Sequence, residues 1–153
     1  MTIARDVCTY LQMHARQWVT DDAFHHDVDA LNVTNADGRS ALYLNQVPSD
    51  VTNCICVYDT GGYSSVRYHG NTIPASHPTA QVRIRHASLD AAEVTADRIH
   101  ELLDEIYHET INGHYYLRIN SVSPPSYIGC DQVTTAGKAY EFVLNLNSTV
   151  KRL

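Results

Sequence analysis

Nine histidines are the side chains in this sequence that could most readily hold a metal ion. They are His14, His25, His26, His69, His77, His86, His100, His108 and His114. The densest group is His25-His26-Asp27 with Asp21 and Asp22. Adjacent histidines point apart on a strand and diverge on a helix, so one ion cannot easily take both. The chain has neither an HExxH motif nor a Cys-His zinc spacing. We predict no metal and no cofactor, with a small metal-binding protein as an alternative.

The segment Val57-Tyr58-Asp59-Thr60-Gly61 has the residue order found at the catalytic turn of aspartic proteases. Those enzymes need two such aspartates that share one proton, so a chain of 153 residues would have to dimerise. Ile128-Gly129 could stand for the second apolar-glycine element of a retroviral-type protease. The long helix expected after Leu89, however, has no place in a half-size protease. The simpler interpretation is a strand that ends in a tight turn, with Asp59 bonded to nearby backbone amides.

No other motif points to catalysis. The sequence has no phosphate-binding glycine loop and no Gly-x-Ser-x-Gly elbow, and nothing local favours a Ser/His/Asp triad. The four cysteines, Cys8, Cys54, Cys56 and Cys130, match no zinc or redox spacing, so we expect buried thiols in a reducing cytoplasm. On a strand, Cys54 and Cys56 would share one face. We predict that the protein is not an enzyme and has no catalytic residues.

Composition limits the possible partners. The net charge is −6 and hydrophobic residues make up 44% of the chain, which is typical of a soluble globular domain. The sequence contains no basic stripe or tail, so it gives little support to sequence-independent binding of the DNA backbone. We also expect no sequence-specific nucleic-acid binding. Apolar runs are too short to span a membrane, and the N-terminus carries charges where a signal peptide needs apolar residues. We therefore expect no membrane partner.

The first half of the chain predicts one helix and two strands. Apolar residues at helical spacing indicate a helix over residues 3–15, which Thr2 could cap. Residues 16–39 are polar and acidic, and we expect a loop or short irregular insertion. Strands are expected at 40–47 and 53–58, after which Asp59-Thr60-Gly61-Gly62 breaks the second strand. Residues 62–78 then form a long loop or a hairpin arm.

The second half predicts a strand at 79–86, a long helix, and strands at 114–122 and 138–147. Ser88 or Asp90 could cap the helix, Asp90 with Glu93 fits a capping box, and the apolar face runs through about Glu109. Asn112-Gly113 is expected to end this helix. This order favours an α+β fold with a mostly antiparallel sheet. Both helices should cover one face, and residues 1–153 should form a single domain.

The order of these motifs resembles the phage minor capsid or tail-terminator family of tailed viruses. The resemblance rests on Tyr58-Asp59-Thr60-Gly61-Gly62, the strand Pro78-Thr-Ala-Gln-Val-Arg-Ile-Arg85, the Asn-Gly turn, the Pro-Pro break and Gly129-Cys130-Asp131. It covers the N-terminal helix and residues 40–150, and makes residues 59–62 a fold-defining turn. It implies a hexameric ring on the last ring of tail-tube subunits of a siphovirus-type tail. That ring would stop tail polymerisation and face the neck, at the head-proximal end of the tail, in a virion assembled in the host cytoplasm.

We expect the ring contacts on aromatic and arginine residues, which are enriched at protein interfaces. In the loop 62–78 these include Tyr63, Arg67, Tyr68 and His69. Arg83 and Arg85 alternate on one strand face, which is either solvated or in contact with another subunit. The implied partners are further copies of the chain, the tail tube protein and a neck or head-tail connector protein. A neck or head-completion connector protein remains the first alternative function, and a dimeric aspartic protease that uses Asp59 is a remote one.

Overall fold

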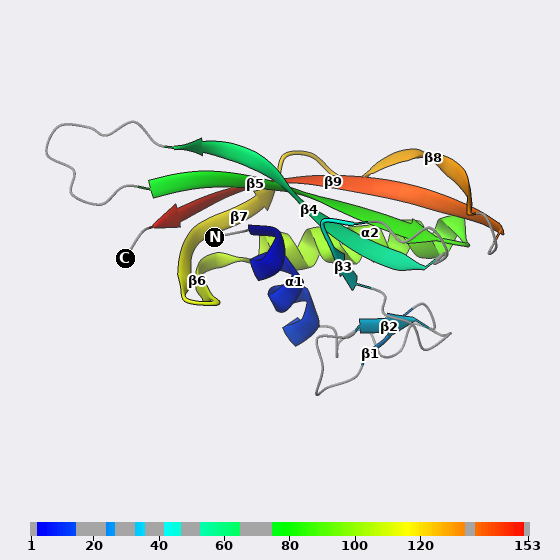
Figure 1. The fold of residues 1–153 in the computed structure, drawn as a ribbon, viewed down its shortest axis with the longest axis horizontal. Helices are drawn as coiled ribbons and strands as arrows, with labels where there is room; N and C mark the ends of the chain where they lie inside the picture. The colour runs from blue at the N-terminus through cyan, green and yellow to red at the C-terminus, as the bar shows by residue number, and fades with distance from the viewer. Residues whose placement is uncertain are drawn as a thin grey trace, which may run out of the picture.

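The computed structural model describes residues 3–14, 24–26, 33–35, 42–46, 53–64, 75–133 and 137–151. These residues form a curved sheet with two helices on one side (Figure 1). In chain order the elements are α1 (Ile3–His14), β1 (Phe24–His26), β2 (Val33–Asn35), β3 (Leu42–Leu44), β4 (Cys54–Ser64), β5 (Ala75–His86), α2 (Leu89–Asp104), β6 (Tyr107–Ile111), β7 (His114–Ser121), β8 (Ser126–Val133) and β9 (Gly137–Lys151).

Strand β9 is the centre of the main sheet. Along one edge it pairs with β5, from Ala75 opposite Lys151 to His86 opposite Tyr140. Along the other edge β7 pairs with its C-terminal part and β8 with its N-terminal part. Strands β4 and β3 extend the sheet beyond β5, and β6 extends it beyond β7. Among these pairs β3–β4 alone is parallel, so the predicted α+β fold with a mostly antiparallel sheet is confirmed.

Both helices bury their apolar stripes against the same face of the sheet, as predicted. In α2, Ala92, Ala96, Ile99 and Leu103 recur at helical spacing and are fully buried. They share one core with alternate residues of the strands. This core includes Ile55, Val57, Val82, Ile84, Leu144 and Leu146. Because strand side chains alternate between faces, the residues between these positions point to the opposite side of the sheet.

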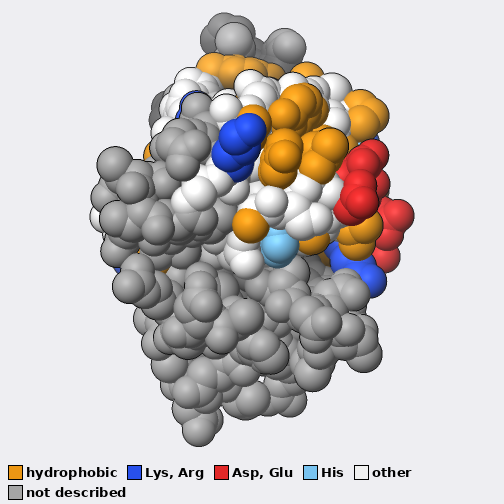
Figure 2. All heavy atoms as spheres, turned by 90° about the vertical axis from the view of Figure 1, so that its right-hand side faces the viewer, with side chains coloured by type: hydrophobic (Ala, Val, Ile, Leu, Met, Phe, Trp, Pro, Cys, Tyr) orange, Lys and Arg blue, Asp and Glu red, His pale blue; other side chains and the backbone are white. Residues whose placement is uncertain are grey.

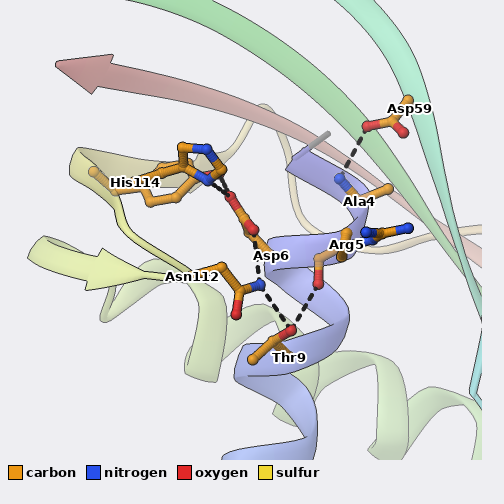
Figure 3. Close-up of polar contacts among 8 residues, drawn as sticks. Ala4, Arg5, Asp6, Thr9, Asp59, Asn112 and His114 are labelled. Carbon is orange, nitrogen blue, oxygen red and sulfur yellow. Dashed lines mark hydrogen bonds and ion pairs between the residues drawn. The ribbon is translucent and has the colours of Figure 1, made fainter. Parts of the chain in front are cut away.

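A buried carboxylate fixes α1 to the β6–β7 hairpin (Figure 3). Asp6 is 1% exposed. Its Oδ1 accepts a hydrogen bond from Asn112 Nδ2 at 2.9 Å, and its Oδ2 lies 2.8 Å from His114 Nδ1. The Tyr116 hydroxyl also donates to Oδ2. A buried charge needs such partners, so this network determines where α1 lies on the sheet.

The long helix ends earlier than the sequence pattern suggested. Helix α2 stops at Asp104 instead of near Glu109, and Ile106 reaches the core from the connection that follows. Residues 107–111 form β6, a strand the sequence analysis missed. Asn112-Gly113 is therefore the two-residue turn of a hairpin, with φ of 49° and 81°, not a helix stop. Ser88 is the N-cap of α2 and accepts from the Ala91 N–H, so the capping box at Asp90 is not what starts the helix.

Three other segments also differ from the expectation. The sequence analysis did not predict β8, a strand that follows the Pro124-Pro125 break. Strand β9 continues to Lys151, beyond the predicted end at Asn147. Within residues 16–39, β1 and β2 pair as a short antiparallel ribbon. The rest of that segment, and the predicted cap Thr2, lie outside the described residues.

Candidate assembly surface

Asp59 binds the start of α1. Its Oδ1 accepts a hydrogen bond from the backbone N–H of Ala4 at 2.9 Å (Figure 3). Asn45 Nδ2 donates to Asp59 Oδ2 at 3.2 Å, and the Asp59 N–H donates to Asn45 Oδ1 at 2.9 Å. The first N–H groups of a helix have no partner within the helix, and a carboxylate is favoured at this positive end of the dipole. Asp59 is thus bonded to a backbone amide, as expected, but one that belongs to a distant helix.

The Asp59-Thr60-Gly61-Gly62 segment lies inside β4, so the prediction that it breaks the strand is wrong. Asp59 lies opposite Ala80 and Gly61 opposite Thr79, which leaves Thr60 as a β-bulge. Gly61 and Gly62 have φ of 100° and 121°. A Cβ on Gly62 would lie 2.2 Å from the His77 carbonyl oxygen, so only glycine fits there. These features allow β4 to continue to Ser64 and form the β4–β5 arm of Figure 1.

We call the side of the main sheet opposite α1 and α2 the open face. At one end of it Arg85 and Glu141 are 7% and 9% exposed, with 3.9 Å between Nη1 and Oε1. Arg83 is partly exposed, and its guanidinium lies 5.5 Å from the centre of the Tyr58 ring. Arg83 Nε donates to Gln81 Oε1 at 2.9 Å. The expectation that both arginines share a face is confirmed, but Arg83 is the more accessible of the two.

A row of register partners crosses the open face from β4 to β6. Tyr63 lies opposite His77, and their rings stack with centroids 4.7 Å apart. His77 Nδ1 lies 3.3 Å from Thr149 Oγ1, Thr149 is opposite Arg118, and Arg118 is opposite Tyr107. Tyr63 is 68% exposed and Tyr107 is 65% exposed. We call these five residues the tyrosine row. Exposed tyrosine and arginine are typical of protein interfaces.

The backbone of β6 is strained next to Tyr107, at one end of the tyrosine row. Leu117 is bulged in β7, because the register with β9 shifts between Tyr116 and Arg118. Opposite this point His108 has a φ of 52°, a conformation that non-glycine residues rarely adopt. The His108 ring packs edge-on against Tyr107, with centroids 4.2 Å apart, and its Nδ1 lies 2.8 Å from the Tyr115 hydroxyl. Such strain is commonly found at functional sites.

Comparison with protein families matches residues 14–152 to the bacteriophage tail terminator protein family. This match covers nearly the whole chain. The chain belongs to the bacteriophage tail terminator family. A comparison with curated proteins finds no match. The family is one of structural proteins, so this tail terminator has a structural role in ending the phage tail and is a component of the virion tail.

A serine, a histidine and an aspartate of the terminator do come together, but not as a catalytic triad. Ser121 Oγ lies 3.2 Å from His100 Nδ1, and Asp104 Oδ2 lies 3.3 Å from the same nitrogen. In a triad the aspartate binds one ring nitrogen and the serine binds the other. Asp104 Oδ1 also accepts from the Ser121 N–H and hydroxyl, at 3.0 and 3.1 Å. The group therefore connects α2 to β7.

Three cysteines of the terminator are buried and one, Cys130, is exposed. Cys54 and Cys56 share the open face, as predicted, with their sulfurs 3.9 Å apart. The hydrogen bond between the two thiols, together with burial, raises the pKa of the Cys56 thiol. Burial, with a smaller contribution from the Asp59 charge, raises the pKa of Cys8 to about 12. Cys8 and Cys56 therefore stay protonated near neutral pH and are poor nucleophiles.

Among the described residues, no group of three or more His, Cys, Asp or Glu side chains is placed to hold a metal ion. The described helices include none that is long and apolar enough to cross a membrane. His108, which the sequence pattern placed on the long helix, lies in β6 instead.

The predicted interface residues of the terminator are only partly described. Tyr63 is in the tyrosine row, and Arg83 and Arg85 lie on the same face, whereas Arg67, Tyr68 and His69 lie outside the described residues. Sequence reasoning missed Tyr107 and Arg118. Tyr107 was assigned to a helix, and Arg118 joins the row only through the Leu117 bulge. A strand pattern before Asn112-Gly113 could have indicated β6, because Asn-Gly is a strong hairpin signal.

Proposed function

We propose that this protein forms a ring on the head-proximal end of the tail tube, stops polymerisation of the tube protein and joins the tail to the neck. Membership of the tail terminator family is the observation that carries this proposal. The resemblance of the motifs implies six subunits and a minor capsid protein of a siphovirus-type particle, assembled in the host cytoplasm. The whole chain, residues 1–153, would act as one domain.

A closed ring requires two different surfaces on each subunit that match each other. The open face with its tyrosine row supplies one candidate surface, because it presents aromatic rings and an arginine outside the core. The β4–β5 arm adds a second element that can reach a neighbour. We propose that Tyr63, Arg83 and the arm residues Arg67, Tyr68 and His69 contact a neighbouring subunit or the tube. Arg85 is buried and paired with Glu141, so it would hold the strands of that surface in place without itself contacting the neighbour.

Addition of the purified protein to polymerising tube subunits tests this function. The expected result is that tubes stop growing and carry a ring at one end, as seen by negative-stain electron microscopy. An Arg67→Ala/Tyr68→Ala double variant should cap fewer tubes at the same concentration. If the wild-type protein leaves both the length and the ends of the tubes unchanged, the capping proposal is wrong. If the double variant caps normally, the arm contact is wrong and the capping proposal stands.

A further inference from the structure

The outward side of α2 is an acidic stripe that also exposes Val94. Five acidic residues are exposed on the side of the helix opposite its buried residues: Asp90, Glu93, Asp97, Glu101 and Glu105. Val94, on the same side, is 48% exposed. Leu89 is 41% exposed because it is the first residue of the helix, but it lies two turns before the buried Ala96 and so above the buried stripe. Figure 2 shows acidic side chains next to hydrophobic ones at the end of the molecule where α2 begins.

The open face has the complementary charge. On β4, β5, β7 and β9 its accessible charged side chains are Arg83, Arg118 and Lys151, which register places on one side of the sheet. Glu141, the carboxylate on these strands that shares this side, is buried beside Arg85. The tyrosine row lies between Arg83 and Lys151 and offers rings for apolar contact. The face therefore suits a partner that is acidic and partly apolar.

The dimensions of the two surfaces also agree. From Asp90 to Glu101 the stripe extends for about 16 Å, at ~1.5 Å per helical residue. On β9, Val143 lies opposite Arg83. The distance along the strand from Val143 to Lys151 is about 25 Å, at ~3.3 Å per strand residue. The stripe and the open face lie on opposite sides of the subunit, so one molecule can use both at the same time. Such a head-to-tail contact can close into a ring.

We infer that the acidic stripe of α2 in one subunit docks on the open face of the next subunit, across its tyrosine row. This inference rests on the ring proposed above and specifies which surfaces form it. A second copy of the chain is the favoured occupant because the same molecule carries both complementary surfaces. Duplex DNA would also suit a basic face, but it is not complementary to the acidic stripe that the same molecule carries.

Two charge-reversed variants of the full chain test this docking. The face variant is Arg83→Glu/Arg118→Glu, and the stripe variant is Asp97→Lys/Glu101→Lys. Lys138→Glu is the matched control, because Lys138 is an exposed basic residue whose strand position faces away from the open face. The mass of each protein is measured by sedimentation velocity at low and high salt, and circular dichroism checks folding. Binding of a fluorescent DNA duplex is measured in parallel.

Each variant alone is expected to stay monomeric, with subunit association weakened about a hundredfold or more, because like charges then face each other. An equimolar mixture of the two variants should form a ring with alternating subunits, since every contact again joins opposite charges. The Lys138→Glu protein should assemble like wild type, and salt should weaken assembly of the wild type.

The negative outcomes separate the two proposals. If wild-type protein stays monomeric at low salt and high concentration, the ring itself is wrong, and this docking with it. If wild type forms rings and either charge-reversed variant does so equally well, the ring stands but the docking surfaces are wrong. If a mixture of two folded, monomeric variants does not assemble, the pairing of stripe with face is wrong. DNA binding that the face variant abolishes while its subunits still assemble would assign the open face to nucleic acid instead.

Discussion

Asp59 in β4 accepts a hydrogen bond from the backbone N–H of Ala4 at the start of α1, across 55 positions of sequence. The residue that most suggested catalysis therefore connects the N-terminal helix to the sheet. Asp59→Ala removes this bond and the bond from Asn45, and should lower the free energy of unfolding by about 1–2 kcal/mol, the usual effect of losing a helix cap. Urea denaturation measures the change.

Asp59→Asn is the matched control, because its amide oxygen can still accept from Ala4. The Asn variant should lose less stability than the Ala variant and should assemble normally. Equal stability for Asp59→Ala and wild type would show that the cap contributes nothing. Loss of a proteolytic activity in a folded Asn variant would instead revive the aspartic protease hypothesis.

Gly62 should tolerate substitution far less well than Gly61. Both have positive φ, but a Cβ on Gly62 would lie 2.2 Å from the His77 carbonyl oxygen, whereas a Cβ on Gly61 has no atom within 4 Å. Gly61→Ala should cost about 1 kcal/mol from backbone strain alone. Gly62→Ala should cost about 3 kcal/mol or more, because the β4–β5 arm must also move. Thermal unfolding of the two variants gives the comparison, and similar losses would mean that the arm adjusts freely at Gly62.

Stability should fall in mild acid because of His86. Burial lowers the pKa of His86 below its ordinary value of 6.5, and its Nδ1 accepts a hydrogen bond from the Ser88 N–H at 2.9 Å. The folded state thus takes up a proton at this site less readily than the unfolded state. The stabilisation is present above pH 6.5 and is lost as the pH falls below it. In His86→Asn, which keeps an acceptor but cannot ionise, urea denaturation between pH 7 and 5 should show a shallower loss. Identical pH slopes would rule out this role.

The tyrosine row should matter for assembly and not for folding. Tyr63 and Tyr107 are more than half exposed, so Tyr63→Ala and Tyr107→Ala should each change the free energy of unfolding by about 0.5 kcal/mol or less. Truncation of a tyrosine that is a hot spot of an interface costs about 2 kcal/mol or more in binding. Tyr127→Ala is a control, because Tyr127 is 50% exposed on β8, outside the row. Normal capping of tail tubes by both row variants would exclude the row from the assembly surface.

The elements that sequence predicted well are those with one uninterrupted pattern. The alternation in β5 and the apolar spacing from Ala92 to Leu103 each indicate burial on one side. The strand covers the predicted residues 79–86, although it begins earlier, at Ala75, and the helix forms over the predicted apolar face. The end of α2 was misjudged because Ile106 continues the helical spacing although it lies beyond the helix. Local periodicity cannot show that the following residues pair with β7.

The assembly surface depends on contacts that no local pattern contains. The tyrosine row exists because β9 brings β5 and β7 together and because the Leu117 bulge turns Arg118 to the open face. The role of Asp59 likewise depends on where α1 packs, which Asp6 determines through residues more than a hundred positions away. The sequence alone indicated Tyr63, Arg83 and Arg85 as candidate interface residues. Tyr107 and Arg118 could be recognised as candidates only from the fold.

The length of tails in phage particles made without this protein tests the central claim most directly. A tail terminator limits growth of the tube, so electron microscopy should show overlong tails that are not joined to heads. Supply of the wild-type protein should restore tails of uniform length. Tails of normal length attached to full heads would contradict the account, and tailless, leaking heads would indicate a neck or head-completion connector instead.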